Sequence, residues 1–250
     1  MARLQAARVL VVGLGGVGSW AAEALARSGI GHLTLMDGDD ICVSNTNRQL
    51  HAVADWIGRP KAEALASRIL AINPECRVRA RREFYLTGNP ERPFDEPLDV
   101  VVDCIDGVMS KATLIGSARS RGISVITCGG AAGKLDPSLV RTDDLAHAHH
   151  DRLLMFVRKK LRRHFGLPGG GNRKMGVLCV YSPEPVKMPD PCDAEKTVSG
   201  IDPNSGPVCE GRLGSAVFVT AVFGFHAAAA AVRLLLGNQA PNHSAKLAST

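Results

Sequence analysis

The sequence predicts an α/β fold: a doubly wound, mostly parallel sheet with a C-terminal antiparallel extension and a long apolar helix. Three observations predict it. Short apolar runs, typical of strands buried on both faces, alternate with helical segments through about residue 130. A glycine-rich turn at 13–18 joins the first run to the first helix. Residues 213–236 are almost wholly apolar, as expected of one buried helix.

Each element of the first half has a local signal. Gly29 ends the first helix, because glycine readily adopts the left-handed conformation found there. Pro60 suits the first position of the second helix. The binding site of such a sheet is expected at the carboxyl ends of its strands. We expect strands at 8–13, 32–37, 76–84, 98–104 and 123–130, and helices at 16–29, 60–73 and 108–121.

Beyond residue 130 the alternation ends. A basic helix is expected at 150–165, a flexible glycine loop at 167–174 and a strand at 175–182. Residues 182–211, rich in Pro, Gly and Asp, are expected to form a long crossing loop. The apolar segment 213–236 has the length of a membrane span, but the α/β unit before it favours a buried core helix. Membrane association is therefore the less favoured alternative.

Composition narrows the class of protein. A formal charge of +6 and a pI near 9.1 favour an acidic partner such as RNA without requiring one. Aromatic residues make up only 4%, which argues against a large stacking platform for single-stranded nucleic acid. None of the seven cysteines forms a C-x-x-C pair, and no signal peptide is recognisable. These features indicate a reducing, cytoplasmic location without a disulfide framework or a four-cysteine zinc site.

The turn "GLGGVG" at 13–18 fits the pattern G-x-G-x-x-G between a strand and a helix, as in Rossmann-like nucleotide sites. Glycines let the backbone approach a phosphate, and the helix N-terminus favours negative charge. Asp37 ends the next strand, where a carboxylate can hold ribose hydroxyls. The alternatives are a structural turn without nucleotide and an NAD dehydrogenase.

The polar loop after Asp37 decides between these readings. Activating a carboxylate with ATP requires a ribose acid, amide or hydroxyl groups near the phosphates, cations and an acid to carry Mg²⁺. The sequence supplies these groups in order. A hydride-transfer site, by contrast, has little use for Arg48 and Lys61 at these positions. Singly, Arg48 could be a surface charge, Lys61 an exposed helix residue and Asp106 a helix N-cap. The candidate set is Asp37, Ser44, Asn45, Arg48, Lys61 and Asp106.

These motifs together resemble the ubiquitin-activating-enzyme-like superfamily, which includes ThiF- and MoeB-type enzymes. They are G-x-G-G-x-G, then D-x-D-x-V/I-x-x-S-N-x-x-R-Q, then "GRPK", then D-x-x-D. Members adenylate the C-terminal carboxylate of a small protein. The resemblance implies a single adenylating domain over 1–237, with a nucleotide-binding half at about 1–135 and a substrate or crossover half at about 136–237. A disordered tail is expected at 238–250.

The resemblance also implies the site residues. Arg48, Lys61 and Asp106 would be catalytic, with Asp106 carrying Mg²⁺ through ATP. The residues expected to bind ATP are Gly13, Gly15, Gly16, Gly18, Asp37, Asp39, Ser44, Asn45, Arg48, Lys61, Cys104, Ile105, Asp106 and Gly107.

Longer stretches of the sequence resemble one branch of this superfamily, the tRNA threonylcarbamoyladenosine dehydratases. ThiF- and MoeB-type members usually carry two C-x-x-C pairs for a structural zinc, which this sequence lacks, so no structural zinc is expected. The resembling stretches include "GGVGSWAAEALARSGIG", "CVSNTNRQLHA", "CGGAAGKLDP" and "GVLCVYSPE". The implied reaction is adenylation of the threonyl carboxylate of threonylcarbamoyladenosine, next to the tRNA anticodon. Attack by the carbamoyl group then closes a ring with net loss of water.

Three alternatives stay open. The protein could activate a ubiquitin-like or sulfur-carrier protein, act as a nucleotide-binding adaptor in a sulfur-transfer complex, or be an NAD dehydrogenase. The chemistry needs no enzyme nucleophile, so Cys192 and Cys209 are weak candidates for one. The run "HAHH" at 147–150 could bind a metal, although clustered histidines on a polar loop are usually adventitious.

The resemblance further implies partners. We expect a homodimer, a link to a cysteine desulfurase system, and tRNA as substrate. Superfamily members commonly place an N-terminal arginine in the partner's ATP site, and Arg3 and Arg8 are the candidates here. Basic side chains that could contact tRNA phosphates are Arg158, Lys159, Lys160, Arg162, Arg163, Arg173 and Lys174.

Overall fold

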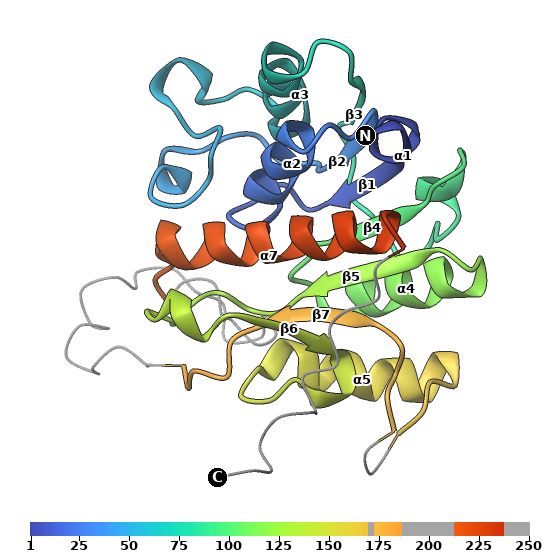
Figure 1. The fold of residues 1–250 in the computed structure, drawn as a ribbon. Coiled ribbons are helices and arrows are strands. Elements are labelled where there is room, and N and C mark those ends of the chain that lie inside the picture. Colours follow the sequence, from blue (N-terminus) through green and yellow to red (C-terminus); the bar gives the residue numbers. More distant parts are fainter. Residues whose placement is uncertain (170–172, 187–212, 238–250) are drawn as a thin grey trace, which may run out of the picture.

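A seven-stranded sheet in the order β3-β2-β1-β4-β5-β7-β6 forms the centre of the protein (Figure 1). This computed structural model describes residues 1–169, 173–186 and 213–237. All strand pairs are parallel except β6–β7. The elements are α1 Ala2–Ala6, β1 Arg8–Val12, α2 Gly18–Arg27, β2 His32–Met36, α3 Lys61–Ile72, β3 Arg77–Arg81, β4 Val100–Asp103, α4 Val108–Ser120, β5 Ser124–Cys128, β6 Arg141–Asp144, α5 Arg152–Phe165, β7 Leu178–Tyr181 and α7 Val217–Leu235.

Both faces of the sheet are covered, which explains the continuous apolar runs of its central strands. In β1, Val9 and Val11 point into a core shared with α2, α3 and α7. Leu10 and Val12 point the other way, into a core shared with α4 and α5. Because successive strand residues alternate faces, one five-residue run supplies both cores. The predicted doubly wound, mostly parallel fold with an antiparallel extension is confirmed.

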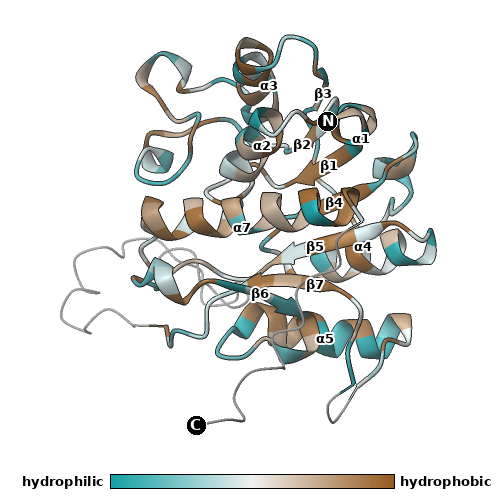
Figure 2. Cartoon of the chain, in the orientation of Figure 1, coloured by the Kyte–Doolittle hydropathy of each residue, from teal (hydrophilic) through white to brown (hydrophobic). Residues whose placement is uncertain are grey.

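The long apolar helix α7 lies across one face of the sheet beside α2, and is the red helix of Figure 1. By length and composition it could cross a membrane, but half of its most apolar window is buried inside the protein. Val219, Phe223 and Ala227 face the core. Phe218 and Phe225 are exposed on its outer side, and the helix is largely brown in the hydropathy colouring of Figure 2. This arrangement supports the core-helix expectation.

Several boundaries differ from the sequence expectations. Helix α1 precedes the first strand and was not expected. Pro60 is the residue just before α3 and not its first helical residue. The third strand is shorter than 76–84 and lies at the sheet edge, mostly exposed. The apolar helix begins at Val217, four residues later than expected. Most of the crossing loop at 182–211 and the whole tail at 238–250 lie outside the described residues.

The strand register brings the candidate site to one edge. Val12 is level with Met36 on β2 and with Asp103 on β4, and Asp103 is level with Thr127 on β5. The residues that follow these strands therefore start from the same edge. The strand order reverses between β1 and β4, and such a reversal opens a crevice outside the carboxyl ends of the strands.

Candidate active site

The glycines of the turn after β1 have distinct tasks. Gly13 has φ +83°, and a Cβ there would lie 2.8 Å from the Cys104 carbonyl oxygen. A Cβ at Gly18 would overlap the Gly13 carbonyl oxygen, at 1.8 Å. A Cβ at Gly16 would press on Thr220 and Arg48, at 3.2 and 3.3 Å. Only Gly15 has open room, its nearest neighbour being the Gln49 amide nitrogen at 3.7 Å. Three glycines thus shape the turn, and Gly15 leaves the backbone accessible.

Asp37, the expected ribose acid, fastens this turn to the end of β2. Its Oδ2 accepts a hydrogen bond from the Leu14 amide at 2.6 Å, and its Oδ1 accepts one from the Asp39 amide at 2.8 Å. Burial raises the pKa of Asp37, and the two amides and the Lys61 charge offset part of that rise. Each carboxylate oxygen has a second lone pair, so ribose hydroxyls could still donate to it.

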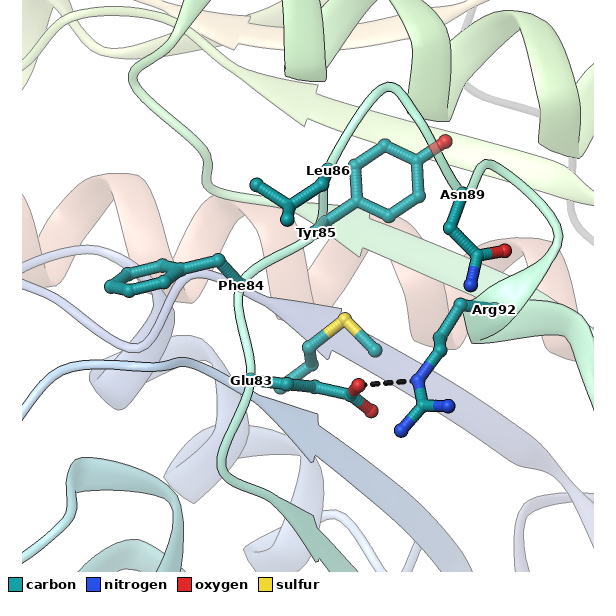
Figure 3. Close-up of a pocket in the computed structure, with 7 residues that line it drawn as sticks. Glu83, Phe84, Tyr85, Leu86, Asn89 and Arg92 are labelled. Carbon is teal, nitrogen blue, oxygen red and sulfur yellow. Dashed lines mark hydrogen bonds and ion pairs between the residues drawn. The ribbon is translucent and has the colours of Figure 1, made fainter.

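A pocket of about 270 Å³ lies next to Asp37, between the end of β2 and the segment after β3 (Figure 3). Phe84 packs over Gly38, where a Cβ would lie 2.6 Å from its ring, so this position accepts only glycine without a shift. Glu83 and Arg92 form an ion pair across the pocket. The apolar run Phe84 to Leu86 was a signal for this pocket that sequence reasoning missed. The lining residues are Met36, Glu83, Phe84, Tyr85, Leu86, Asn89 and Arg92.

The polar loop holds Arg48 by its backbone and leaves its charge unpaired. The Arg48 carbonyl oxygen accepts from the Trp20 indole at 3.1 Å. Its guanidinium donates to the Ser44 carbonyl oxygen at 3.0 Å and the Asn47 amide oxygen at 2.9 Å, with no carboxylate partner among the described residues. Asn45 accepts from the Cys42 amide at 3.1 Å through Oδ1, which leaves its amide nitrogen to donate. Arg48 and Asn45 can therefore receive an anion.

Lys61 is not an exposed helix residue, which was the structural alternative for it in the sequence. It begins α3, is 5% exposed, and its ammonium lies 2.7 Å from Oδ2 of Asp39. The Asp39 side chain is 53% exposed at the site. One ammonium hydrogen serves this ion pair, and two remain for phosphate oxygens. Asp39, one of the residues expected to bind ATP, thus orients the lysine.

Buried polar atoms without partners mark the floor between Lys61 and the glycine turn. They are Oε1 of Gln49 and both ring nitrogens of His51. Burial and the nearby Lys61 charge lower the pKa of His51 to about 4, so the ring is neutral near pH 7. Buried polar groups normally have partners, so these atoms are exceptions among the described residues. The open backbone at Gly15 and the cations of Arg48 and Lys61 suit a polyphosphate.

The other side of the crevice carries a free acid. Asp106 follows β4, is exposed, and makes no hydrogen bond or ion pair within the described parts of the chain. Gly107 is the N-cap residue of α4, which has no side-chain cap, so Asp106 does not serve as one. A carboxylate with both oxygens available is chemically suited to Mg²⁺. Its neighbour Cys104 lies 3.9 Å, sulfur to sulfur, from Cys128, and the pKa of the Cys104 thiol is raised by that contact and by burial.

Two buried charges beneath this acid were missed by sequence reasoning. Asp103, at the end of β4, and Lys111, on α4, are both fully buried and lie 3.0 Å apart. A lysine in a helix of otherwise small and apolar core residues was the available signal.

The basic residues expected to contact tRNA lie away from the crevice. Helix α5 begins beside Gly130, whose amide donates to Asp151 at 2.9 Å, and ends with Phe165 against Gly116 near the end of α4. Its basic second half therefore points toward the opposite edge of the sheet. Arg158 points inward, donating to the Leu145 and Ala148 carbonyl oxygens. Lys160 is half-buried, and the exposed members are Lys159, Arg162, Arg163, Arg173 and Lys174.

The other candidates lie elsewhere in the described part of the chain or outside it. Arg8 begins β1, at the far edge, and Arg3 donates to the Leu236 carbonyl oxygen at 3.2 Å. Within the described residues no cluster of His, Cys, Asp and Glu could hold a metal, "HAHH" included. His147 contacts Asp143, and His150 contacts the Pro183 carbonyl oxygen. Cys192 and Cys209 lie outside the described residues.

Comparison with known proteins identifies relatives over nearly the whole chain. The model of the ThiF family matches residues 1–250. A tRNA threonylcarbamoyladenosine dehydratase of Escherichia coli (strain K12) is 43% identical over 238 residues, which cover 94% of this chain and 88% of that protein. A protein of the same name from Haemophilus influenzae is 41% identical, with the same two coverages.

Solved structures agree with the sequence relatives. The crystal structure of the E. coli tRNA N6-threonylcarbamoyladenosine dehydratase, TcdA, in complex with ATP superposes with a TM-score of 0.81 at 41% identity. It covers 94% of this chain and 87% of that one. The corresponding AMP complex gives a TM-score of 0.80 at 41% identity.

Proposed function

The chain belongs to the ThiF family, and we propose that within it the protein is an ATP-dependent tRNA threonylcarbamoyladenosine dehydratase. The observation that carries the proposal is 43% identity over 94% of the chain to a dehydratase of that name. The site adds chemical support: the crevice combines an accessible phosphate loop and two cations on one side with a free carboxylate on the other.

Each side of the crevice would hold one part of ATP. Asp37 would accept hydrogen bonds from the ribose hydroxyls, and the neighbouring pocket has the size for the base, with Phe84 and Leu86 among its apolar lining residues. The Gly15 backbone, Arg48 and Lys61 neutralise the phosphates, with Lys61 oriented by Asp39. Asp106 would hold Mg²⁺, which would offset the charge of the phosphates. These roles of the site residues are part of the proposal.

The proposed reaction is adenylation followed by ring closure. An oxygen of the threonyl carboxylate bonds to the α-phosphorus of ATP, and pyrophosphate leaves. The carbamoyl group of the same nucleoside then attacks the activated carbonyl carbon, loses a proton, and AMP departs. The net change in the nucleoside is loss of one water. Because nucleophile and electrophile belong to one molecule, the enzyme needs only to orient them and exclude solvent water.

We also propose a homodimer that binds tRNA. The outward apolar side chains of α7, including Val217, Phe218 and Phe225, favour a contact with a second copy. The exposed basic residues of α5 favour phosphate contacts at a distance from the reacting nucleoside, which a large RNA can make. The cysteine desulfurase partner and the cytoplasmic location stay predictions.

The test is a nucleoside assay. The protein is incubated with ATP, Mg²⁺ and tRNA that carries threonylcarbamoyladenosine, and the digested nucleosides are measured by mass spectrometry. Loss of one water that requires ATP and releases pyrophosphate is the expected result. A parallel reaction replaces the tRNA with a carrier protein ending in Gly-Gly. ATP–pyrophosphate exchange with that protein alone would overturn the proposal and select a carrier-activating enzyme.

A further inference from the structure

A lysine and an aspartate are buried directly beneath Asp106, although neither reaches the crevice. Lys111 of α4 and Asp103 at the end of β4 are both 0% exposed, and their charged atoms lie 3.0 Å apart. Removing a charge from water costs roughly several kcal/mol for each ion, so a buried ion pair of this kind is weak evidence for stability. A different function should explain why they stand at this place.

The lysine ammonium binds the turn that leads to Asp106. It donates to the Ile105 carbonyl oxygen at 2.7 Å and to the Asp103 carbonyl oxygen at 3.3 Å. With the Asp103 carboxylate, these oxygens use all three ammonium hydrogens. The lysine therefore grips both the first and the third residue of the segment 103–106.

The aspartate closes the same turn from the other side. Its Oδ1 accepts from the Ile105 amide at 3.1 Å, and its Oδ2 accepts from the Thr127 hydroxyl of β5 at 2.7 Å. Both backbone polar groups of Ile105 are thus fixed, the amide by Asp103 and the carbonyl by Lys111. The carbonyl of Ile105 belongs to the peptide unit that bears Asp106, so its direction sets where Asp106 starts.

Asp106 itself has nothing else to hold it. Its side chain makes no hydrogen bond among the described residues, and the helix it precedes has no side-chain cap. Without the buried pair, the segment 104–107 would keep the backbone hydrogen bonds from the Cys104 amide to Val12 and from the Lys111 amide to Gly107, neither of which holds Ile105 or Asp106. A carboxylate intended for a metal must be held to within about 0.5 Å by its supporting residues.

We propose that Lys111 is a positioning residue: its buried ammonium fixes the Ile105 carbonyl so that Asp106 presents its carboxylate to the metal-bound nucleotide. Lys111 touches neither substrate nor metal and acts through the backbone of the Ile105–Asp106 peptide. The assignment rests on the proposed role of Asp106 in the ATP site.

The test measures Mg²⁺ dependence in four proteins: wild type, Lys111→Met, Asp106→Asn and the double variant. Methionine keeps the length and the packing of the lysine stem. Binding of ATP is titrated at increasing Mg²⁺ by calorimetry, and thermal unfolding is recorded for each protein. Lys111→Met is expected to raise the Mg²⁺ concentration for half-maximal ATP binding about tenfold, with metal-free ATP binding unchanged. In the Asp106→Asn background, the same substitution should add little, because the group it positions is already gone.

A matched control is Lys134→Met. Lys134 is 2% exposed and its ammonium also serves carbonyl oxygens, those of Ser182 and Glu184 at 2.8 and 2.9 Å, away from the segment 103–106. It should shift the unfolding temperature without shifting the Mg²⁺ dependence. If Lys111→Met does not fold, Thr127→Val, which removes a single hydrogen bond to Asp103, should shift the Mg²⁺ dependence in the same direction by a smaller factor.

Two results would overturn the proposal. One is a folded Lys111→Met protein, or Thr127→Val in its place, with wild-type Mg²⁺ dependence. The other is a double variant in which the fold-changes in Mg²⁺ dependence of the two single variants multiply fully. Because ATP binding is measured without tRNA, these outcomes are independent of the proposed activity. If the wild type binds ATP with Mg²⁺ but leaves the modified tRNA unchanged, the dehydratase proposal fails and the positioning result still stands.

Discussion

The acids that follow β2 and β4, the strands on either side of β1, are held in opposite ways. Asp37, on the β2 side, is 8% exposed and both its oxygens accept backbone amides. Asp106, on the β4 side, is exposed and its side chain contacts no described hydrogen-bond partner. The Asp37 side chain stabilises the fold through its hydrogen bonds, whereas Asp106 is fixed through its backbone by Lys111. The side chain that is free of local hydrogen bonds is the one available for chemistry.

The largest effect should come from Asp106→Asn. We expect the rate of dehydration to fall on the order of 10²-fold or more, because the amide cannot replace the charge at a metal-bound phosphate. The unfolding temperature should stay at the wild-type value, since the carboxylate has no internal partner. The measurements are single-turnover kinetics and a thermal melt. A large loss of stability would contradict the contrast drawn with Asp37.

The same substitution on the opposite side, Asp37→Asn, should show the reverse order of effects. One of the two backbone amides loses its acceptor, and an unsatisfied buried donor costs about 1–3 kcal/mol. The free energy of unfolding, measured with urea, should fall by that amount, and ATP should bind more weakly. Unchanged stability would mean that Asp37 holds only the ribose.

A third prediction concerns the neutral ring beside Lys61. The pKa of His51 is lowered from 6.5 to about 4 in the folded protein. Between these values the unfolded chain binds a proton that the folded protein does not, so stability falls as pH falls through that window. The loss should reach about 3 kcal/mol near pH 4. Urea unfolding of wild type and His51→Leu from about pH 7.5 to about pH 4.5, roughly one unit above and two units below that window's upper end, should show a smaller pH slope in the variant.

The smallest effect should arise at the edge of the sheet opposite the crevice. Arg163→Gln on α5 should raise the KM for tRNA a few-fold and leave the single-turnover rate unchanged, because a phosphate contact far from the site supports binding only. The salt slope of tRNA binding should fall by about 1. A change in the single-turnover rate would instead place the reacting nucleoside near α5.

Parts of the site with a fixed sequence spacing were predictable. The glycine turn, the acid after β2 and the acid after β4 follow from strand ends that the apolar runs mark, and the register brings them to one edge. The expected fold and family are confirmed by the comparisons. Helix α1 and strand β6 carry weak local signals, since β6 is a short run of Arg, Thr and Asp whose strand partner is β7.

What depends on three-dimensional contact could not be predicted. The burial of Lys111 is decided by α4 packing against the sheet over the end of β4, which no local pattern specifies. The pocket under Phe84 joins β2 to a segment after β3. The direction of α5, which carries the basic residues away from the crevice, follows from the return of the chain along the sheet before Asp151. Each of these features depends on contacts between residues distant in the sequence, so local sequence patterns do not determine it.

The contact of Gly16 with Thr220 has a further consequence. The first turn of α7 touches the glycine turn, and the Arg48 carbonyl accepts from both Trp20 and Thr220. The same helix exposes Phe218 and Phe225 two residues before and five after that contact. A second subunit seated on this helix would therefore bear on the nucleotide loop. Linkage then requires reciprocity: whatever factor subunit association adds to ATP affinity, ATP adds to association, so the two equilibria cannot be tuned separately.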